Sequence, residues 1–117
     1  MKEGRIDSRQ RLLHMLEAIA EVQGFVAGVS RAEFDLDHRT LFACVRGVEI
    51  LGEAARHVAD EIKAQYPEIN WRGIVDLRNF VVHQYFAIDN EALWLVIHDH
   101  MPVLKPQLER VLQALSV

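Results

Sequence analysis

Hydrophobic residues recur along this chain at intervals of three and four positions, and no segment shows the strict alternation of a half-buried strand. The clearest apolar series is C-terminal: Trp94, Ile97, Met101, Leu104, Leu108, Val111 and Leu115. Such a seam is the packing pattern of bundle helices. Pro102 and Pro106 fall within it, but the apolar phase continues through both, which predicts one helix kinked at the prolines.

Capping residues divide the N-terminal half into helices. Asp7 or Ser8 is expected to cap a first helix that runs to about Gly28. Ser30 and Glu33 have the spacing of a capping box, which predicts a short helical turn.

A long helix is expected to follow from Asp37 to about Gln65. Its apolar positions keep the helical period: Leu41, Val45, Val48, Ala55, Val58 and Ile62. Tyr66-Pro67 ends it, because proline disfavours helix in the residue before it.

Two more helix starts complete the pattern. Asn70 can cap a third main helix that begins at Trp71, and Asp89 or Asn90 starts the last one. The predicted fold is all-α, an antiparallel bundle of four main helices plus a short extra helical turn. With 117 residues, the chain is expected to form a single domain over 1–117.

Composition narrows the classes of protein. There is one cysteine, Cys44, in an apolar helical context, so neither a disulfide framework nor a cysteine metal cluster is expected. The polar first ten residues do not read as a signal peptide, and no apolar run is long enough to span a membrane, which together favour a cytoplasmic location. The net charge of -4 argues against coating nucleic acid through charge alone, but allows local engagement of RNA.

The segment from Leu77 to Phe86 carries the candidate chemistry, because it places a cation in an apolar stripe. If the segment is helical, one face holds Trp71, Ile74, Arg78, Val81 and Tyr85. A guanidinium there is expected to face a carboxylate, a partner subunit or a phosphate. Glu53, among the small residues of its helix, is a candidate partner, whereas Asp76 lies about 200 degrees around the helix.

His83 lies about 140 degrees from Arg78 on a regular helix. The two side chains would meet if the helix unwound near Gln84, or if two copies faced each other across a dimer. Asn79 and Asp76 share the helical face of His83, and either could fix its tautomer. The hydroxyl of Tyr85 either lies in water at the edge of the core, or is a contact or modification site.

Several stretches together resemble the HepT-like branch of the HEPN superfamily. They are the motif Arg78-x4-His83-x-Tyr85, the long-helix segment Glu49–Ala55, the turn Pro67–Arg72, and the C-terminal features Tyr85-Phe86-x-Ile88-Asp89, Trp94 and Met101-Pro102-x-Leu104. The resemblance covers about residues 8–115. It implies a HEPN-like bundle that forms a homodimer through the Arg78–Tyr85 helix, bringing two motifs into one cleft.

The resemblance also implies a function. Members are metal-independent endoribonucleases without a cofactor, which act as the toxin of a type II-like toxin–antitoxin pair. The usual antitoxin is a minimal nucleotidyltransferase, which can transfer AMP to the motif tyrosine, here Tyr85.

The motif residues suit cleavage by the RNA 2′-hydroxyl. His83 would serve as general base or acid, Arg78 would stabilise charge on the phosphorane-like transition state, and Asn79 would orient the phosphate or His83. The products would carry a 2′,3′-cyclic phosphate and a 5′-hydroxyl. Relatives often have glycine where this chain has Gln84, so the backbone is expected to be less free there.

A second hypothesis is a non-catalytic helical interaction module. Arg78 would then form a structural salt bridge, and an acidic surface would bind a nucleotidyltransferase or another basic partner. The apolar residues Phe80–Val82 and the acidic balance of the chain favour this alternative.

Overall fold

The computed structural model of the protein describes residues 2–115, with the side chains of 7–85 and 87–115. The elements in chain order are α1 (Lys2–Phe25), α2 (Arg31–Leu36), α3 (His38–Arg56), α4 (Asp60–Gln65), α5 (Trp71–Val75), α6 (Leu77–Val81), the 3-10 turn η1 (Gln84–Phe86), α7 (Asn90–Leu95), the π-helical turn η2 (Val96–His100) and α8 (Met101–Leu115). No strand occurs among the residues that the structure describes, which confirms the predicted all-α fold.

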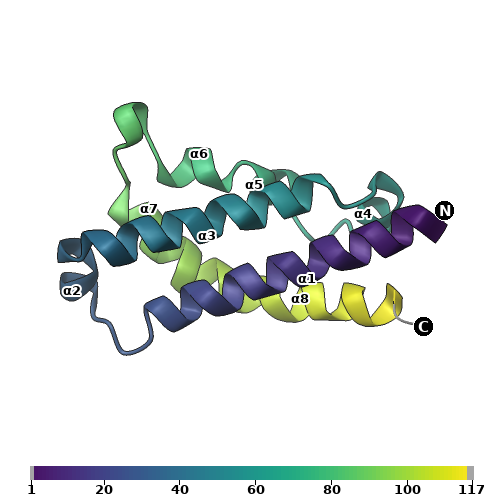
Figure 1. Cartoon of the computed structure of the whole chain (residues 1–117), viewed down its shortest axis with the longest axis horizontal. Helices are drawn as coiled ribbons and strands as arrows, with labels where there is room; N and C mark the ends of the chain where they lie inside the picture. The colour runs from purple at the N-terminus through teal and green to yellow at the C-terminus, as the bar shows by residue number, and fades with distance from the viewer. Residues whose placement is uncertain (1, 116–117) are drawn as a thin grey trace.

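α3 is the central helix of an elongated molecule of 46 × 30 × 21 Å. It packs along α1 on one side and against α5 and α6 on the other, while α8 lies against α1 (Figure 1). The largest fully buried side chains come from these helices and from α2, α7 and η2: Leu12, Met15, Ile19, Val22, Phe34, Val48, Leu51, Val81, Leu93, Ile97, Met101 and Leu108. Burial of each such side chain stabilises the fold by about 1.5–3 kcal/mol.

α3 and α5 approach each other at Gly52. A Cβ added at this glycine would lie 3.1 Å from the carbonyl oxygen of Ile74 and 3.3 Å from that of Val75. Both neighbours are backbone atoms, which cannot move aside as a side chain does. The small residue is therefore what lets the two helices pack so closely.

The predicted start of the first helix at Asp7 or Ser8 is wrong, because α1 begins at Lys2. Ser8 lies inside the helix and is buried, and its Oγ accepts a 2.9 Å hydrogen bond from the backbone N–H of Ala59. The serine thus satisfies a backbone donor at the start of α4 rather than at the start of its own helix.

The predicted single helix from Asp37 to Gln65 is wrong in its second half. Asp37 caps α3 as expected, since its Oδ1 accepts from the Thr40 N–H at 3.1 Å. The helix ends at Arg56, and α4 starts after a break over residues 57–59. No glycine or proline marks that break. It coincides with the distant bond from Ala59 to Ser8.

Two further helix boundaries follow the prediction. Ser30 and Glu33 form the expected capping box of α2. α4 ends at Gln65, directly before Tyr66-Pro67. These bonds are local in sequence, which is why spacing alone reveals them.

The C-terminal seam forms one run of helical turns over residues 90–115, as predicted. Its irregularity is a π turn, in which the Met101 N–H donates to the carbonyl of Val96, five residues back. Pro102 follows directly, and Pro106 lies within α8. Every predicted seam residue is either buried or packs against the core.

Candidate active site

The helix predicted from Trp71 through Tyr85 is broken in the structure. Asn70 caps α5 as expected, with its Oδ1 accepting from the Gly73 N–H at 2.9 Å. The helix is interrupted at Asp76 and α6 ends at Val81. The prediction that Arg78 and Tyr85 lie on one continuous helical stripe is therefore wrong.

After α6 the chain forms a closed loop. Val82 and Ile88 make an antiparallel β-bridge. The His83 N–H donates to the Ala87 carbonyl at 2.8 Å, and the Asp89 N–H donates to the Val81 carbonyl, also at 2.8 Å. Adjacent β-branched residues at the end of α6 favour this extended backbone. The loop stands out from the bundle between α6 and α7 (Figure 1).

Arg78 has a carboxylate partner, one of the three alternatives expected from the sequence. Its Nε lies 3.7 Å from Oε2 of Glu49 on α3. The expected partner Glu53, one turn further along α3, pairs instead with Arg56 at 3.7 Å and His57 at 3.0 Å. The Arg78 side chain is 38% exposed, so its guanidinium is also open to an anion from solvent.

His83 pairs with a residue that the sequence analysis did not connect to it. Its Nε2 lies 3.1 Å from Oδ2 of Asp89, and its side chain is 59% exposed. The expected orienting residues, Asp76 and Asn79, do not pair with it, because His83 lies outside the helix that would align them. Both are exposed residues of the α6 region, and Asn79 follows Arg78 directly.

Asp89 has two roles in the structure. Its Oδ1 caps α7 by accepting from the Ala92 N–H at 3.0 Å, while Oδ2 meets the ring of His83. The bond from Ala92, and then that from His83, hold the pKa of the Asp89 carboxyl below its usual value. In the sequence, Asp89 stood out only as a helix start and as part of the Tyr85-Phe86-x-Ile88-Asp89 stretch, and neither connected it to His83.

Tyr85 occupies the tip of the loop, 95% exposed, with φ 58° and ψ 29°. This left-handed conformation is rare for a residue with a side chain, and such strain occurs most often at functional sites. Gln84, expected to restrict the backbone, does not have a positive φ; Tyr85 does. The tyrosine hydroxyl is in solvent, but the residue lies at the loop tip and not at the edge of the core, where the first of the two alternatives placed it.

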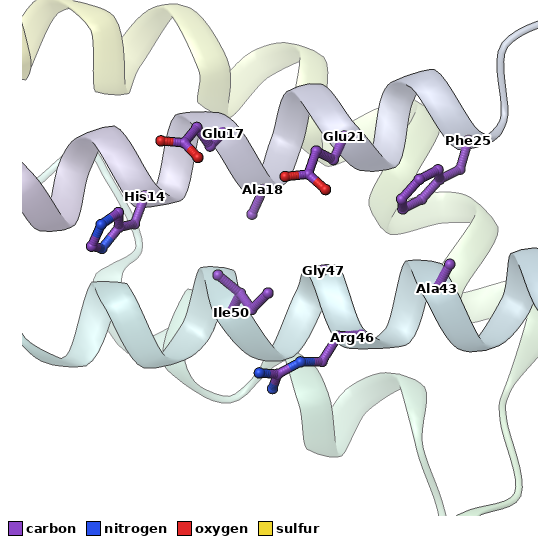
Figure 2. A pocket seen from close by; sticks show the side chains of 9 residues that line it. All are labelled: His14, Glu17, Ala18, Glu21, Phe25, Ala43, Arg46, Gly47 and Ile50. Atoms are coloured by element: carbon purple, nitrogen blue, oxygen red, sulfur yellow. The ribbon is translucent and has the colours of Figure 1, made fainter.

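Two surface hollows lie outside this site. A groove of about 530 Å³ between α5, α6 and α8 contains three carboxylates, Glu68, Asp76 and Asp99, and no Lys or Arg lines it. A smaller hollow of about 290 Å³ lies between α1 and α3, with Glu17 and Glu21 on α1 (Figure 2). The three carboxylates make the groove between α5, α6 and α8 unfavourable for a phosphate backbone, whereas the smaller hollow also contains the cation of Arg46 on α3.

Among the described residues, no three His, Cys, Asp or Glu side chains are grouped so that they could hold a metal ion. No described helix is long and apolar enough to cross a membrane. Cys44 is buried, and burial raises the pKa of its thiol to about 11.

Comparison with known proteins gives a consistent set of matches. The sequence profile described as "Ribonuclease HepT-like" matches residues 15–111. The chain is 34% identical to the "Probable ribonuclease HepT" of Thermococcus cleftensis, over 81% of this chain and 86% of that protein.

Two further relatives carry provisional RNase names. One, from Methanocaldococcus jannaschii, is 31% identical over 90% of this chain and 96% of its own length. The other, from Caldanaerobacter subterraneus, is 30% identical over 90% of this chain and 94% of its own length. No solved structure matches the chain significantly.

Proposed function

Because this chain belongs to the ribonuclease HepT-like family, we propose that it is a metal-independent endoribonuclease whose catalytic groups are Arg78, His83 and Asn79. One observation carries the proposal. Arg78 and His83 are each positioned by a carboxylate, Glu49 and Asp89 respectively, yet both side chains remain open to solvent. A group that is oriented and accessible can act on a large substrate such as RNA.

The proposed reaction is attack of the RNA 2′-hydroxyl on the adjacent phosphorus. His83 accepts the hydroxyl proton as O2′ bonds to phosphorus, and the bond from phosphorus to O5′ breaks. Once protonated, His83 can return this proton to the leaving O5′. Arg78 stabilises the negative charge that develops on the phosphoryl oxygens, and Asn79 orients the phosphate. The products carry a 2′,3′-cyclic phosphate and a 5′-hydroxyl, so the nucleophile comes from the RNA itself.

We further propose that the active form is a homodimer whose two motif segments face each other in one cleft. The interface would include the segment from Arg78 to Tyr85, which is not the continuous helix first expected. Phe80, 53% exposed, supports this, because a large apolar side chain at the surface favours burial by a partner.

The protein would act as the toxin of a toxin–antitoxin pair in the cytoplasm, with a minimal nucleotidyltransferase as antitoxin. The accessible hydroxyl of Tyr85 supports transfer of AMP to this residue, since no described side chain covers it. An AMP group there would add bulk and negative charge two residues from His83. Both effects would oppose the approach of an RNA phosphate.

The alternative is a non-catalytic module that binds a basic protein partner. The groove between α5, α6 and α8 favours it, because it combines carboxylates at Glu68, Asp76 and Asp99 with apolar residues such as Ile74 and Leu77. In this case Arg78 would serve only to tie α6 to α3.

The deciding experiment is incubation of the purified protein with total RNA in the presence of a chelator. Wild type should cleave, and His83→Ala should lose about 10²-fold or more in rate. His57→Ala is the matched control, because His57 also pairs with a carboxylate, Glu53 at 3.0 Å, but far from the motif in the sequence. That variant should cleave like wild type, and the product ends should be cyclic phosphates.

Equal cleavage by wild type and His83→Ala would refute the assignment, since it would point to a contaminating nuclease. Cleavage that stops on chelation would contradict the metal-independent mechanism. Absence of cleavage by wild type, together with tight binding of a basic partner, would favour the interaction module.

A further inference from the structure

His83 and Asp89 stand at the two ends of the same short loop. The backbone bond from the Asp89 N–H to the Val81 carbonyl, and that from the His83 N–H to the Ala87 carbonyl, fix these ends side by side. Within this frame His83 Nε2 lies 3.1 Å from Asp89 Oδ2. The carboxylate is itself held by α7, whose Ala92 N–H donates to the other oxygen.

This arrangement decides which ring nitrogen carries the proton. The pKa of Asp89 is below its usual value, so the carboxyl is ionised near neutral pH and can only accept hydrogen bonds. The ring must therefore donate from Nε2. In the neutral ring the other nitrogen, Nδ1, is then the one with a free lone pair.

We infer that Asp89 is a positioning residue for His83, holding the tautomer in which Nδ1 is the atom that takes the proton from the RNA 2′-hydroxyl. The inference rests on the proposed function and adds to it the identity of the basic atom and of the residue that fixes it. Asp89 does not touch the substrate in this scheme. It acts through the ring, and after proton transfer its charge stabilises the imidazolium.

Asp89 both caps α7 and pairs with His83, so the substitution Asp89→Asn can alter the pairing while keeping the cap. Asparagine is as good an N-cap as aspartate, and capping requires an oxygen on the Ala92 N–H. The amide oxygen therefore takes the place of Oδ1, and the NH₂ group takes that of Oδ2. The NH₂ group donates to Nε2, which moves the ring proton to Nδ1 and removes the basic lone pair from that atom.

The test combines two readouts on the purified full chain. Nitrogen-15 NMR of the His83 ring should find the proton on Nε2 in wild type and on Nδ1 in Asp89→Asn. RNA cleavage by Asp89→Asn should fall by about 10²-fold or more, with the thermal unfolding midpoint close to wild type. Asp37→Asn is the matched control, because Asp37 caps α3 in the same way; it should alter neither readout at His83.

A second variant covers the case in which Asp89→Asn does not fold. Asp89→Ser keeps an N-cap oxygen but is too short to reach His83 at its present distance. Its ring should populate both tautomers, and its cleavage rate should fall between those of wild type and Asp89→Asn. If a substitution at Asp89 acted only by weakening the cap of α7, it would lower the stability of the protein without changing the tautomer of His83.

The same tautomer in wild type and Asp89→Asn would overturn the inference, and so would wild-type cleavage by a variant with the proton on Nδ1. Failure of the proposed function gives a different pattern. In that case the ring proton moves as described, but neither wild type nor any variant cleaves RNA.

Discussion

Arg78 of α6 and Glu49 of α3 form an ion pair across two packed helices, with Nε and Oε2 3.7 Å apart. Glu49 also lies 3.6 Å from Nη1 of Arg46, so one carboxylate stands between two guanidinium groups. The pair orients the cation without enclosing it, since both side chains are more than a third exposed. Arg78 is thus neither a buried core cation nor a freely moving surface one.

Replacing Arg78 by alanine should therefore affect cleavage far more than stability. A half-exposed ion pair contributes about 0–1 kcal/mol, so the free energy of unfolding should change by no more than that. The rate of RNA cleavage should fall by about 10²-fold or more, because the transition-state charge loses its guanidinium. Urea unfolding and cleavage assays on Arg78→Ala measure the two effects.

Arg56→Ala is a suitable control, because Arg56 also forms an exposed pair on α3, with Glu53 at 3.7 Å. It should leave both quantities near wild type. The interaction module would be favoured instead if Arg78→Ala lowered the free energy of unfolding by several kcal/mol and the wild-type protein did not cleave RNA.

Mixed dimers test whether the site combines residues of two subunits. If Arg78 of one subunit acts with His83 of the other, a dimer of Arg78→Ala with His83→Ala has one complete site. Random mixing of the two inactive variants should then restore about a quarter of the wild-type rate, since half the dimers are mixed and each has one of two sites. If the mixture stays inactive under conditions of subunit exchange, the shared-site arrangement is wrong.

Gly52→Ala should destabilise the protein by about 1–3 kcal/mol, because the new methyl meets backbone oxygens of Ile74 and Val75 at 3.1 and 3.3 Å. Gly24→Ala provides the comparison, since a Cβ there meets nothing within 4 Å. It should be neutral or stabilise α1 by up to about 1 kcal/mol. Denaturant unfolding of both variants gives the measurement; equal effects would contradict the close approach of α3 and α5.

Acid should weaken the fold through its capping carboxylates. The pKa values of Asp37 and Asp89 are lowered from 3.8 in the folded state, mainly by hydrogen bonds from Thr40 and Ala92 respectively. A lowered folded pKa gives stability that is present above the unfolded pKa and is lost as the pH falls through the folded value. Unfolding free energies measured from pH 6 down to pH 2 should decline below about pH 4.

The variant Asp37→Asn isolates this contribution, because asparagine still caps α3 but does not titrate. Its stability should depend less steeply on pH than that of wild type over the same range. An equally steep decline in both proteins would show that the Asp37 carboxylate has no part in the acid sensitivity.

Cys44 should resist thiol reagents in the folded protein. With its pKa raised to about 11, only about one thiol in a thousand is ionised at pH 8, and the side chain is buried. Reaction with a chromogenic disulfide should be slow in buffer and rapid in denaturing urea. A cysteine introduced by Leu36→Cys, at a position 82% exposed, should react rapidly in both conditions.

The parts of the fold that were predictable from sequence are those fixed by local bonds. Asp37, Asn70 and Asp89 accept from backbone N–H groups three residues later, so spacing alone identifies them. The apolar seam of the last helix was also predictable, because it depends only on the spacing of neighbouring residues in the sequence. It stays on one side of the helix through the π turn.

The breaks that were missed depend on distant contacts. Ser8 reaches the N–H of Ala59 across the bundle, and nothing near either residue signals the bond. Val82 becomes extended because it pairs with Ile88, which requires the chain to turn back first. The same turn brings Asp89 to His83, so the motif residues could be named from the sequence while the partner of His83 could not.

The bridge between Val82 and Ile88 has a consequence for how this surface can change over time. Because the ends of the loop meet, residues inserted or deleted between Gln84 and Ala87 would leave α6 and α7 where they are. The length and sequence of the loop tip can therefore diverge without altering the bundle. A lineage could change the exposed surface beside His83 while keeping the same core.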